Sequence, residues 1–172
     1  MITIISASNR SGNYTELFAQ KCKEILDEEG VENQLYFLDE IPSPIDLQSI
    51  YNYHNSAFTA IAKKIIAPAD KFVFVAPEYN GSFPGILKFF IDAIEPQNFK
   101  GKKAALIGVS AGRAGNLRGM DHLQDVLHYL QVVIMPPKLP ISQLYKLIDG
   151  DEIVDKETLS LLKKQMKDLI NF

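Results

Sequence analysis

The chain has 172 residues, of which 47% are hydrophobic and 23% charged, a balance typical of one folded domain rather than of a disordered chain. A formal net charge of -3 provides no basic field for nucleic acid, so we expect no nucleic-acid partner. No apolar run is long enough to cross a membrane, and the single cysteine, Cys22, fits a reducing cytosol. We therefore expect a cytoplasmic protein without a membrane partner, folded as a single domain over residues 1–172.

The first segment predicts a strand, a polar loop and a helix. Met1 to Ala7 is apolar, and Ser8 to Thr15 is rich in hydroxyls and amides and contains Arg10. Apolar residues at helical spacing follow, in a helix that should end at Gly30: Phe18, Cys22, Ile25 and Leu26. Free N–H groups at a helix start, small hydroxyls and an arginine together favour a phosphate.

Two observations limit this interpretation of the first loop. It contains no Walker A pattern and no G-x-G-x-x-G, which disfavours nucleoside triphosphates and Rossmann-type dinucleotides. The alternative role is helix capping, with Asn13 and Glu16 forming a variant capping box, and the two roles can coexist.

The next segment predicts a second strand over Val31 to Leu38 and a loop over Asp39 to Ile50. Tyr51 to Asn55 is a polar and aromatic patch that either borders a site or simply leads into a helix. That helix should stop near Pro68, and its apolar face is spaced accordingly: Phe58, Ile61, Ala62 and Ile65.

The most informative stretch is Pro77 to Gly85. It follows Lys71 to Ala76, an apolar run suited to a strand that is buried on both faces of a parallel sheet. A helix begins after it, with Leu87, Phe90, Ile91 and Ile94 on its buried face. A loop between a buried strand and a helix is where open α/β sheets bind ligands, although an ordinary turn is the alternative.

The last third predicts a fourth strand over Ala104 to Val109 and a second small-residue loop over Ser110 to Asn116. A helix then buries Met120, Leu123, Leu127 and Leu130. A short fifth strand, Val132 to Met135, should be stopped by Pro136 and Pro137. Residues 141–151 have no clear assignment, and a final helix should run from about Asp155.

Strands that alternate with helices predict an α/β fold with helices on both faces of a parallel sheet. Five strands favour a flavodoxin-like three-layer sandwich whose five-stranded sheet has the order 2-1-3-4-5. In that order the loops after strands one, three and four meet at one edge. A ligand with a phosphate at one end and a planar ring at the other fits them, and FMN is the leading candidate.

A specific resemblance supports this prediction. The run from Pro77 to Lys88, followed by Ile91 and Asp92, resembles the signature of the NADPH-dependent FMN reductase family. The first loop resembles that family's Gly-Ser-x-Arg-x-x-Ser-x-Asn: Ser8 and Arg10 match, while Asn13 and Thr15 replace the serine and the asparagine.

The resemblance implies an FMN-dependent NAD(P)H oxidoreductase. Hydride would pass from NADPH or NADH to flavin N5 and then to a small acceptor, such as a quinone, free flavin or an azo compound, in a ping-pong cycle. No side-chain acid or base is required, and no metal is expected. The family's homodimers or homotetramers imply a similar assembly. The residues that the resemblance implies for cofactor binding are Ser8, Arg10, Asn13, Tyr14, Thr15, Pro77, Glu78, Tyr79, Asn80, Gly81, Ser110, Gly112 and Gly115.

Alternatives remain open at this stage. The chain could be an electron-transfer or regulatory FMN-binding protein without its own NAD(P)H turnover. Glu78 would contact the flavin ring or a partner chain, or be solvated. A further hypothesis places Arg113, Asn116 and Arg118 against the NADPH phosphate or a neighbouring subunit. The three histidines, at 54, 122 and 128, lack metal-ligand spacing, and Cys22 is expected in the core.

Overall fold

The computed structural model of the chain describes residues 1–44, 50 and 57–172. The main sheet consists of β1 (Ile2–Ser6), β2 (Asn33–Phe37), β3 (Lys71–Pro77), β4 (Lys103–Val109), β5 (Val133–Ile134) and β6 (Leu139–Ile141). The α-helices are α1 (Thr15–Glu28), α2 (Ala57–Ile61), α3 (Gly85–Asp92), α4 (Leu117–Tyr129) and α5 (Lys156–Asn171). A π-helical turn, Ala62–Ile66, continues α2, as predicted for a helix that stops before Pro68.

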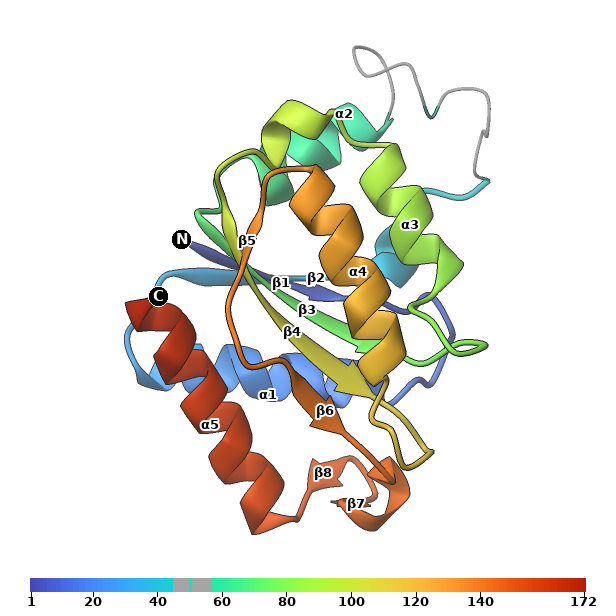
Figure 1. The fold of residues 1–172 in the computed structure, drawn as a ribbon, viewed down its shortest axis with the longest axis vertical. Coiled ribbons are helices and arrows are strands. Elements are labelled where there is room, and N and C mark those ends of the chain that lie inside the picture. The colour runs from blue at the N-terminus through green and yellow to red at the C-terminus, as the bar shows by residue number, and fades with distance from the viewer. Residues whose placement is uncertain (45–49, 51–56) are drawn as a thin grey trace.

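The sheet lies between two helical layers (Figure 1). Its strands pair in parallel in the order β2-β1-β3-β4-β5, which confirms the order predicted from the sequence. One face packs against α1 and α5, and the other against α2, α3 and α4, so the core is divided into two apolar clusters. Cys22 lies fully buried in the α1 side of this core, as expected.

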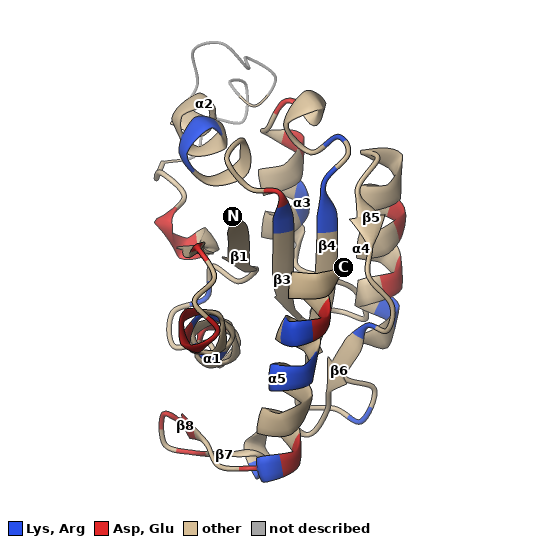
Figure 2. Cartoon of the chain, turned by 90° about the vertical axis from the view of Figure 1, so that its left-hand side faces the viewer, with Lys and Arg blue, Asp and Glu red and all other residues tan. Residues whose placement is uncertain are grey.

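The central strands β3 and β4 owe their position to nearly unbroken apolar sequence, and β1 is buried beside them although it contains Thr3 and Ser6. All five residues of β1 are buried, and so are the interiors of β3 and β4. Charge enters these two strands only at their first residues, Lys71 and Lys103, as the blue strand starts in Figure 2 show. A strand without polar residues on either face is stable only between two covering layers.

The register of the strands brings three loops to one edge. Ser6 pairs with Val75, and Pro77 pairs with Val109, so β1, β3 and β4 end close together. The loops after these strands are therefore neighbours, as the predicted topology required.

The fifth strand differs from the prediction, because it is interrupted rather than stopped. β5 pairs with the beginning of β4, and β6 then pairs with its end, where Ile107 faces Leu139 and Val109 faces Ile141. Pro136 and Pro137 lie between the two pieces, and a proline has no N–H to donate to a ladder. The chain thus leaves the sheet edge and rejoins it.

Residues 141–151, which had no sequence assignment, form a 3-10 turn (Leu144–Lys146) and the start of a hairpin between β7 (Ile148–Asp149) and β8 (Glu152–Ile153). The final helix begins as predicted, with the Asp155 carboxylate accepting the N–H of Thr158 at 2.7 Å. The predicted patch at Tyr51–Asn55 lies outside the described residues.

Candidate functional site

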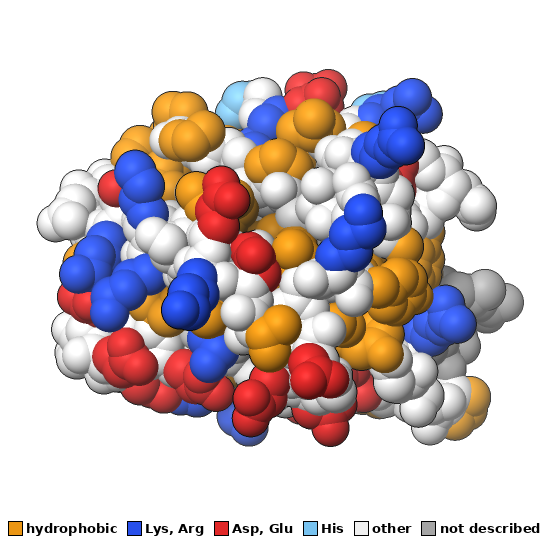
Figure 3. Space-filling view, turned by 90° about the horizontal axis from the view of Figure 1, so that it is seen from below, with side chains coloured by type: hydrophobic (Ala, Val, Ile, Leu, Met, Phe, Trp, Pro, Cys, Tyr) orange, Lys and Arg blue, Asp and Glu red, His pale blue; other side chains and the backbone are white. Residues whose placement is uncertain are grey.

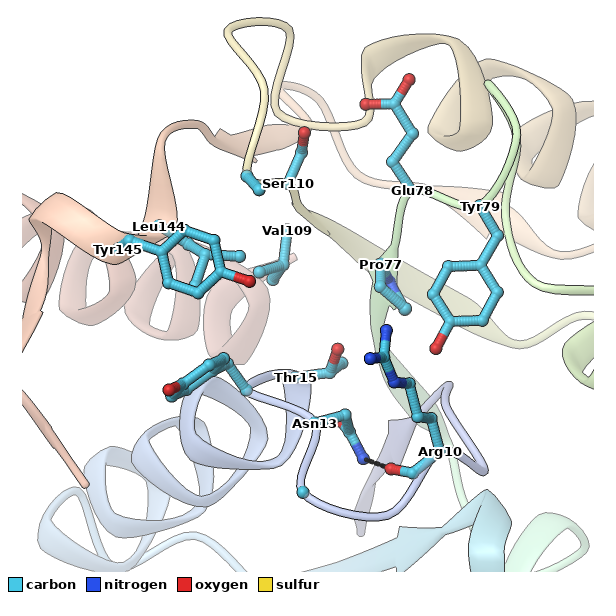
Figure 4. Close-up of a pocket in the computed structure, with 13 residues that line it drawn as sticks. Arg10, Asn13, Thr15, Pro77, Glu78, Tyr79, Val109, Ser110, Leu144 and Tyr145 are labelled. Carbon is cyan, nitrogen blue, oxygen red and sulfur yellow. Dashed lines mark hydrogen bonds between the residues drawn. The ribbon is translucent and has the colours of Figure 1, made fainter. Parts of the chain in front are cut away.

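A cavity of about 210 Å³ opens where the three loops meet. Its walls come from the loops after β1, β3 and β4 and from the 3-10 turn that follows β6 (Figure 4). The lining residues are Arg10, Gly12, Asn13, Tyr14, Thr15, Pro77, Glu78, Tyr79, Val109, Ser110, Ala111, Leu144 and Tyr145. Because ligand pockets usually exceed about 300 Å³, this cavity would enclose one end of a cofactor and leave the rest along the loops.

Asn13 bonds to Glu16 as predicted, although α1 begins at Thr15 and its N-cap position is Tyr14 rather than Asn13. Its Oδ1 accepts the Glu16 N–H at 3.2 Å, and its amide donates to the Arg10 carbonyl at 2.7 Å and to the Glu16 carboxylate. Glu16 therefore bonds to the side chain of Asn13 rather than to its backbone. Within the described chain, the backbone N–H groups of residues 12–15 have no hydrogen-bond acceptor. A helix start with free donors is suited to an anion.

Arg10 is the cation of this loop. Its guanidinium points across the cavity toward Pro77 (Figure 4), and Thr15 lines the same cavity. Among the described residues it has no carboxylate partner, since every ion pair there uses a lysine or the N-terminal amine. An unpaired arginine beside free N–H groups forms a donor set that fits a phosphate.

The loop after β3 is a tight turn. The backbones of Tyr79 and Ser82 exchange two hydrogen bonds, of 2.8 and 3.1 Å. Asn80 and Gly81 lie between them with φ of 53° and 75°, as a type I′ turn requires. Tyr79 lines the cavity, whereas Asn80 and Gly81 do not. Glu78 lines it with a carboxylate that points away from Arg10 (Figure 4).

The loop after β4 is fixed by backbone contacts. The Ser110 Oγ accepts the Gly112 N–H at 2.9 Å. Gly115 packs against Pro140 so closely that an ideal Cβ at position 115 would lie 2.7 Å from the Pro140 Cβ. Ser110 lines the cavity, while Gly112 and Gly115 only shape the loop behind it.

Asn116 is buried beneath these loops rather than exposed beside them. Its exposed fraction is 0%, and its amide donates to the carbonyls of Ala76 and Pro77 at 2.9 and 3.0 Å. The hypothesis that Asn116 meets a nucleotide phosphate or a neighbouring subunit is therefore wrong, because its donors are already used inside the fold. Arg113 and Arg118 remain exposed.

The structure thus brings most of the predicted residues to one cavity and sets five apart. Arg10, Asn13, Tyr14, Thr15, Pro77, Glu78, Tyr79 and Ser110 line it. Ser8, Asn80, Gly81, Gly112 and Gly115 do not. Ser8 is fully buried, with its Oγ 2.9 Å from the Tyr79 hydroxyl.

Five lining residues were missing from the predicted set: Gly12, Val109, Ala111, Leu144 and Tyr145. The first three lie in or beside the predicted loops, whereas Leu144 and Tyr145 come from a turn that the sequence did not assign. Tyr145 meets Tyr14 edge to face, with ring centroids 5.6 Å apart. This contact closes the cavity between the first loop and the turn after β6. An exposed tyrosine after an apolar strand was the available signal, but the interruption of that strand concealed its position.

Other chemistry has little support in the described chain. Burial raises the pKa of the Cys22 thiol to about 12, so it is neither a ready nucleophile nor a thiolate ligand. The described residues contain no group of three or more His, Cys, Asp and Glu side chains placed to hold a metal. None of the described helices is both long and apolar enough to span a membrane.

Comparisons with known proteins agree with this geometry. Residues 1–146 match the family model described as NADPH-dependent FMN reductase. An NAD(P)H-dependent FMN reductase of Pseudomonas aeruginosa is 32% identical over 170 residues, covering 96% of this chain and 90% of that protein. An FMN-dependent NADPH-azoreductase of Staphylococcus saprophyticus is 29% identical, covering 97% of this chain and 91% of its own length.

Solved structures show the same fold. The flavoenzyme NAD(P)H:(acceptor) oxidoreductase FerB of Paracoccus denitrificans superposes with a TM-score of 0.81 at 23% identity, covering 99% of this chain and 94% of its own. The two-electron reduced flavodoxin of Megasphaera elsdenii gives 0.64 at 14% identity over 100% of both chains. The fold is therefore flavodoxin-like, as expected.

Proposed function

This chain belongs to the NADPH-dependent FMN reductase family, and from that premise we propose that it binds FMN at the cavity between its three loops and uses NAD(P)H to reduce a small acceptor. The observation that supports this most directly is the donor set of residues 10–15, an unpaired arginine beside free backbone N–H groups. Bound FMN would supply hydride chemistry at N5, accepting from NAD(P)H and donating to the acceptor.

The residues of the first loop would hold the phosphate end. Arg10 would contribute a charged fork, residues 12–15 their backbone N–H groups, and Thr15 its hydroxyl. Thr15 is only 2% exposed, so its hydroxyl is shielded from competing water. Asn13 would position this loop, since its side chain is engaged by Arg10 and Glu16.

The other two loops would orient the ring. Pro77 and Tyr79 present one edge, and Ser110 with Ala111 presents the other. The N–H of Glu78 is used by the Val109 carbonyl at 3.0 Å, so it stabilises the wall rather than the ring. No described side chain is required as an acid or base.

The acceptor is proposed by class only. The relatives include proteins named 2-hydroxy-1,4-benzoquinone reductase, FMN-dependent NADPH-azoreductase and quinone reductase. We propose a planar, reducible small molecule of this kind, which binds at the same flavin face as NAD(P)H after the nucleotide has left.

We also propose a cytoplasmic location and a homodimer or homotetramer. The assembly is supported by an apolar groove between α3 and α4, which Tyr129 lines with a side chain that is 87% exposed.

The test begins with titration of the purified protein with FMN and with riboflavin, followed by anaerobic addition of NADPH or NADH. Tight FMN binding and rapid loss of flavin absorbance would support the reductase. Tight binding without reduction by either nucleotide would favour the electron-transfer or regulatory alternative.

The variant Arg10→Ala tests whether Arg10 binds the phosphate of FMN. Removing a charge-assisted contact should weaken FMN binding by about tenfold to a hundredfold and leave riboflavin binding within about twofold, because riboflavin lacks the phosphate. Lys23→Ala is the matched control, since it removes one positive charge from an exposed α1 pair with Asp27. An equal loss for both flavins would contradict a phosphate role for Arg10.

A further inference from the structure

The arginines of this chain are distributed very unevenly. The sequence has only three, at 10, 113 and 118, and all lie in or just after the loops that follow β1 and β4. In the part of the chain that the structure describes, none forms an ion pair, although eight ion pairs are made there by other cations. Arg10 faces the cavity, which leaves two uncommitted guanidinium groups at the same edge.

Arg118 lies against the turn that forms one wall of the site. An ideal Cβ at Gly81 would be 2.9 Å from the Arg118 Nη1, so the guanidinium occupies the space that a side chain at 81 would need. Gly81 also has a φ of 75°, which favours glycine for a second reason. Arg118 thereby lies against the Asn80–Gly81 turn, and it does not line the cavity.

His122 and Ser82 link α4 to the same turn. His122 follows Arg118 by one helical turn, so both side chains lie on the same side of α4. The His122 Nδ1 is 2.9 Å from the Ser82 Oγ, which joins the helix to the turn. The Nδ1 atom can bond to Ser82 both in the neutral ring that is protonated at Nε2 and in the charged ring. In both forms the Nε2–H remains free to donate to a ligand.

Two acids of α4 lie within one helical turn of Arg118 or His122: Asp121 and Asp125. Asp121 is ion-paired with Lys138. The lower side of the molecule mixes both signs of charge with apolar side chains, as Figure 3 shows, and presents no broad basic field.

We propose that Arg118, His122 and Ser82 bind the 2′-phosphate of NADPH, which would give this protein a preference for NADPH over NADH. The inference deepens the proposed function and rests on it. A phosphate monoester needs several donors and a positive charge, and a guanidinium, an imidazole and a hydroxyl supply them. Tyr79, which precedes the Asn80–Gly81 turn, lines the flavin cavity, so a dinucleotide crossing this turn would reach both sites.

Arg118→Ala is the main test, measured as steady-state KM and kcat for both nucleotides. The KM for NADPH should rise by about tenfold or more, while the KM for NADH changes less than about twofold and kcat is preserved. Arg118→Lys should recover part of the affinity, because it retains the charge without the planar fork. Parallel increases for both nucleotides, or no increase for NADPH, would overturn the proposal.

Arg113→Ala is the matched control. It removes the same group from a neighbouring exposed loop position, and Arg118, unlike Arg113, lies against Gly81. It should leave the ratio of the two KM values unchanged. If the NADPH-specific loss followed Arg113 instead, the assignment to Arg118 would be wrong.

A binding measurement separates this proposal from the proposed function. Calorimetry with adenosine 2′,5′-bisphosphate and with 5′-AMP needs no flavin turnover. The bisphosphate should bind more tightly than 5′-AMP, and Arg118→Ala should abolish that difference. If the protein reduces flavin with neither nucleotide and the difference is still seen, the reductase assignment fails and the phosphate site stands. Equal binding of the two nucleotides would overturn the site.

Discussion

The hydroxyl of Tyr79 lies 2.9 Å from the Oγ of Ser8, which joins the loop after β3 to the loop after β1. The same Ser8 oxygen accepts the Arg10 N–H at 3.2 Å. Ser8 therefore links the backbone of the first loop to the ring of a cavity-lining tyrosine, and it does so from a fully buried position. This bond sets the separation of the two walls of the site.

Removing either hydroxyl should loosen both walls. Tyr79→Phe leaves the buried Ser8 hydroxyl without this partner, and we expect a loss of about 1 kcal/mol in the free energy of unfolding and a several-fold weaker FMN complex. The measurement is urea denaturation and FMN titration of Tyr79→Phe, Ser8→Ala and the double variant. The double variant should lose less than the sum of the single losses. Additive losses would show that the two groups act independently.

Asn116 connects the second and third loops in a comparable way. Asn116→Ala removes the donors to the Ala76 and Pro77 carbonyls at the end of β3 and places alanine at a φ of 62°. We expect a loss of about 2 to 4 kcal/mol in urea denaturation, because one buried and one partly buried acceptor lose their partner and a left-handed conformation becomes strained. Asn116→Gly also lacks the two hydrogen bonds, but glycine adopts this φ without strain. It should therefore be more stable than Asn116→Ala and less stable than the natural chain. Full recovery with glycine would mean that the hydrogen bonds contribute little.

The sequence predicted the sheet order and the three-loop edge because both follow from local patterns. Nearly unbroken apolar runs at β3 and β4 indicate burial on both faces of the sheet, and the helical spacing of apolar residues in α1 and α3 indicates one buried face on each helix. The bond between Asn13 and Glu16 could also be predicted, since the two residues are three positions apart in the sequence.

Contacts between segments that are distant in the sequence could not be predicted from such local patterns. Leu144 and Tyr145 reach the cavity only because β6 resumes pairing with β4 beyond two prolines. Asn116 looked like a ligand-facing loop residue, yet its amide bonds to carbonyls about forty positions earlier. Nothing within a short window of sequence reports such a bond.

Cys22 should make stability depend on alkaline pH. Burial raises the pKa of its thiol from 9.0 to about 12 in the folded chain. The folded state therefore keeps its proton where the unfolded chain has lost it, and stability declines as pH rises from 9.0 to about 12, by up to about 1.4 kcal/mol per pH unit for this one group. Tyr36, with its pKa raised to about 12 mainly by burial and further by Glu40 and Asp39, contributes in the same direction.

Cys22→Ala isolates the thiol from the tyrosine. Its free energy of unfolding, measured by urea denaturation over this alkaline range, should fall less steeply with pH than that of the natural chain. A thiol reagent should label Cys22 only as fast as the native chain opens, since the side chain is fully buried. Rapid labelling of the folded protein, or identical slopes with and without the thiol, would contradict this assignment.

Gly119 allows α4 to approach the turn that carries Tyr79. An ideal Cβ at position 119 would lie 2.7 Å from the backbone nitrogen of Phe83 and 2.0 Å from the Asn116 Oδ1. Gly119→Ala must therefore push the turn away from the helix or displace the Asn116 amide. Alanine favours helices over glycine by about 1 kcal/mol, but overpacking typically costs about 1 to 3 kcal/mol and should dominate here.

Gly85→Ala is the matched substitution, because Gly85 is also helical and an ideal Cβ there meets nothing within 4 Å. In urea denaturation we expect Gly119→Ala to be destabilised and Gly85→Ala to be unchanged or slightly more stable. FMN affinity should fall with the first and not with the second, since only the first moves the wall that contains Tyr79. If both variants gained stability, the contact between α4 and the turn would have to be looser than the structure shows, and the proposed phosphate site at Arg118 that depends on it would lose its support.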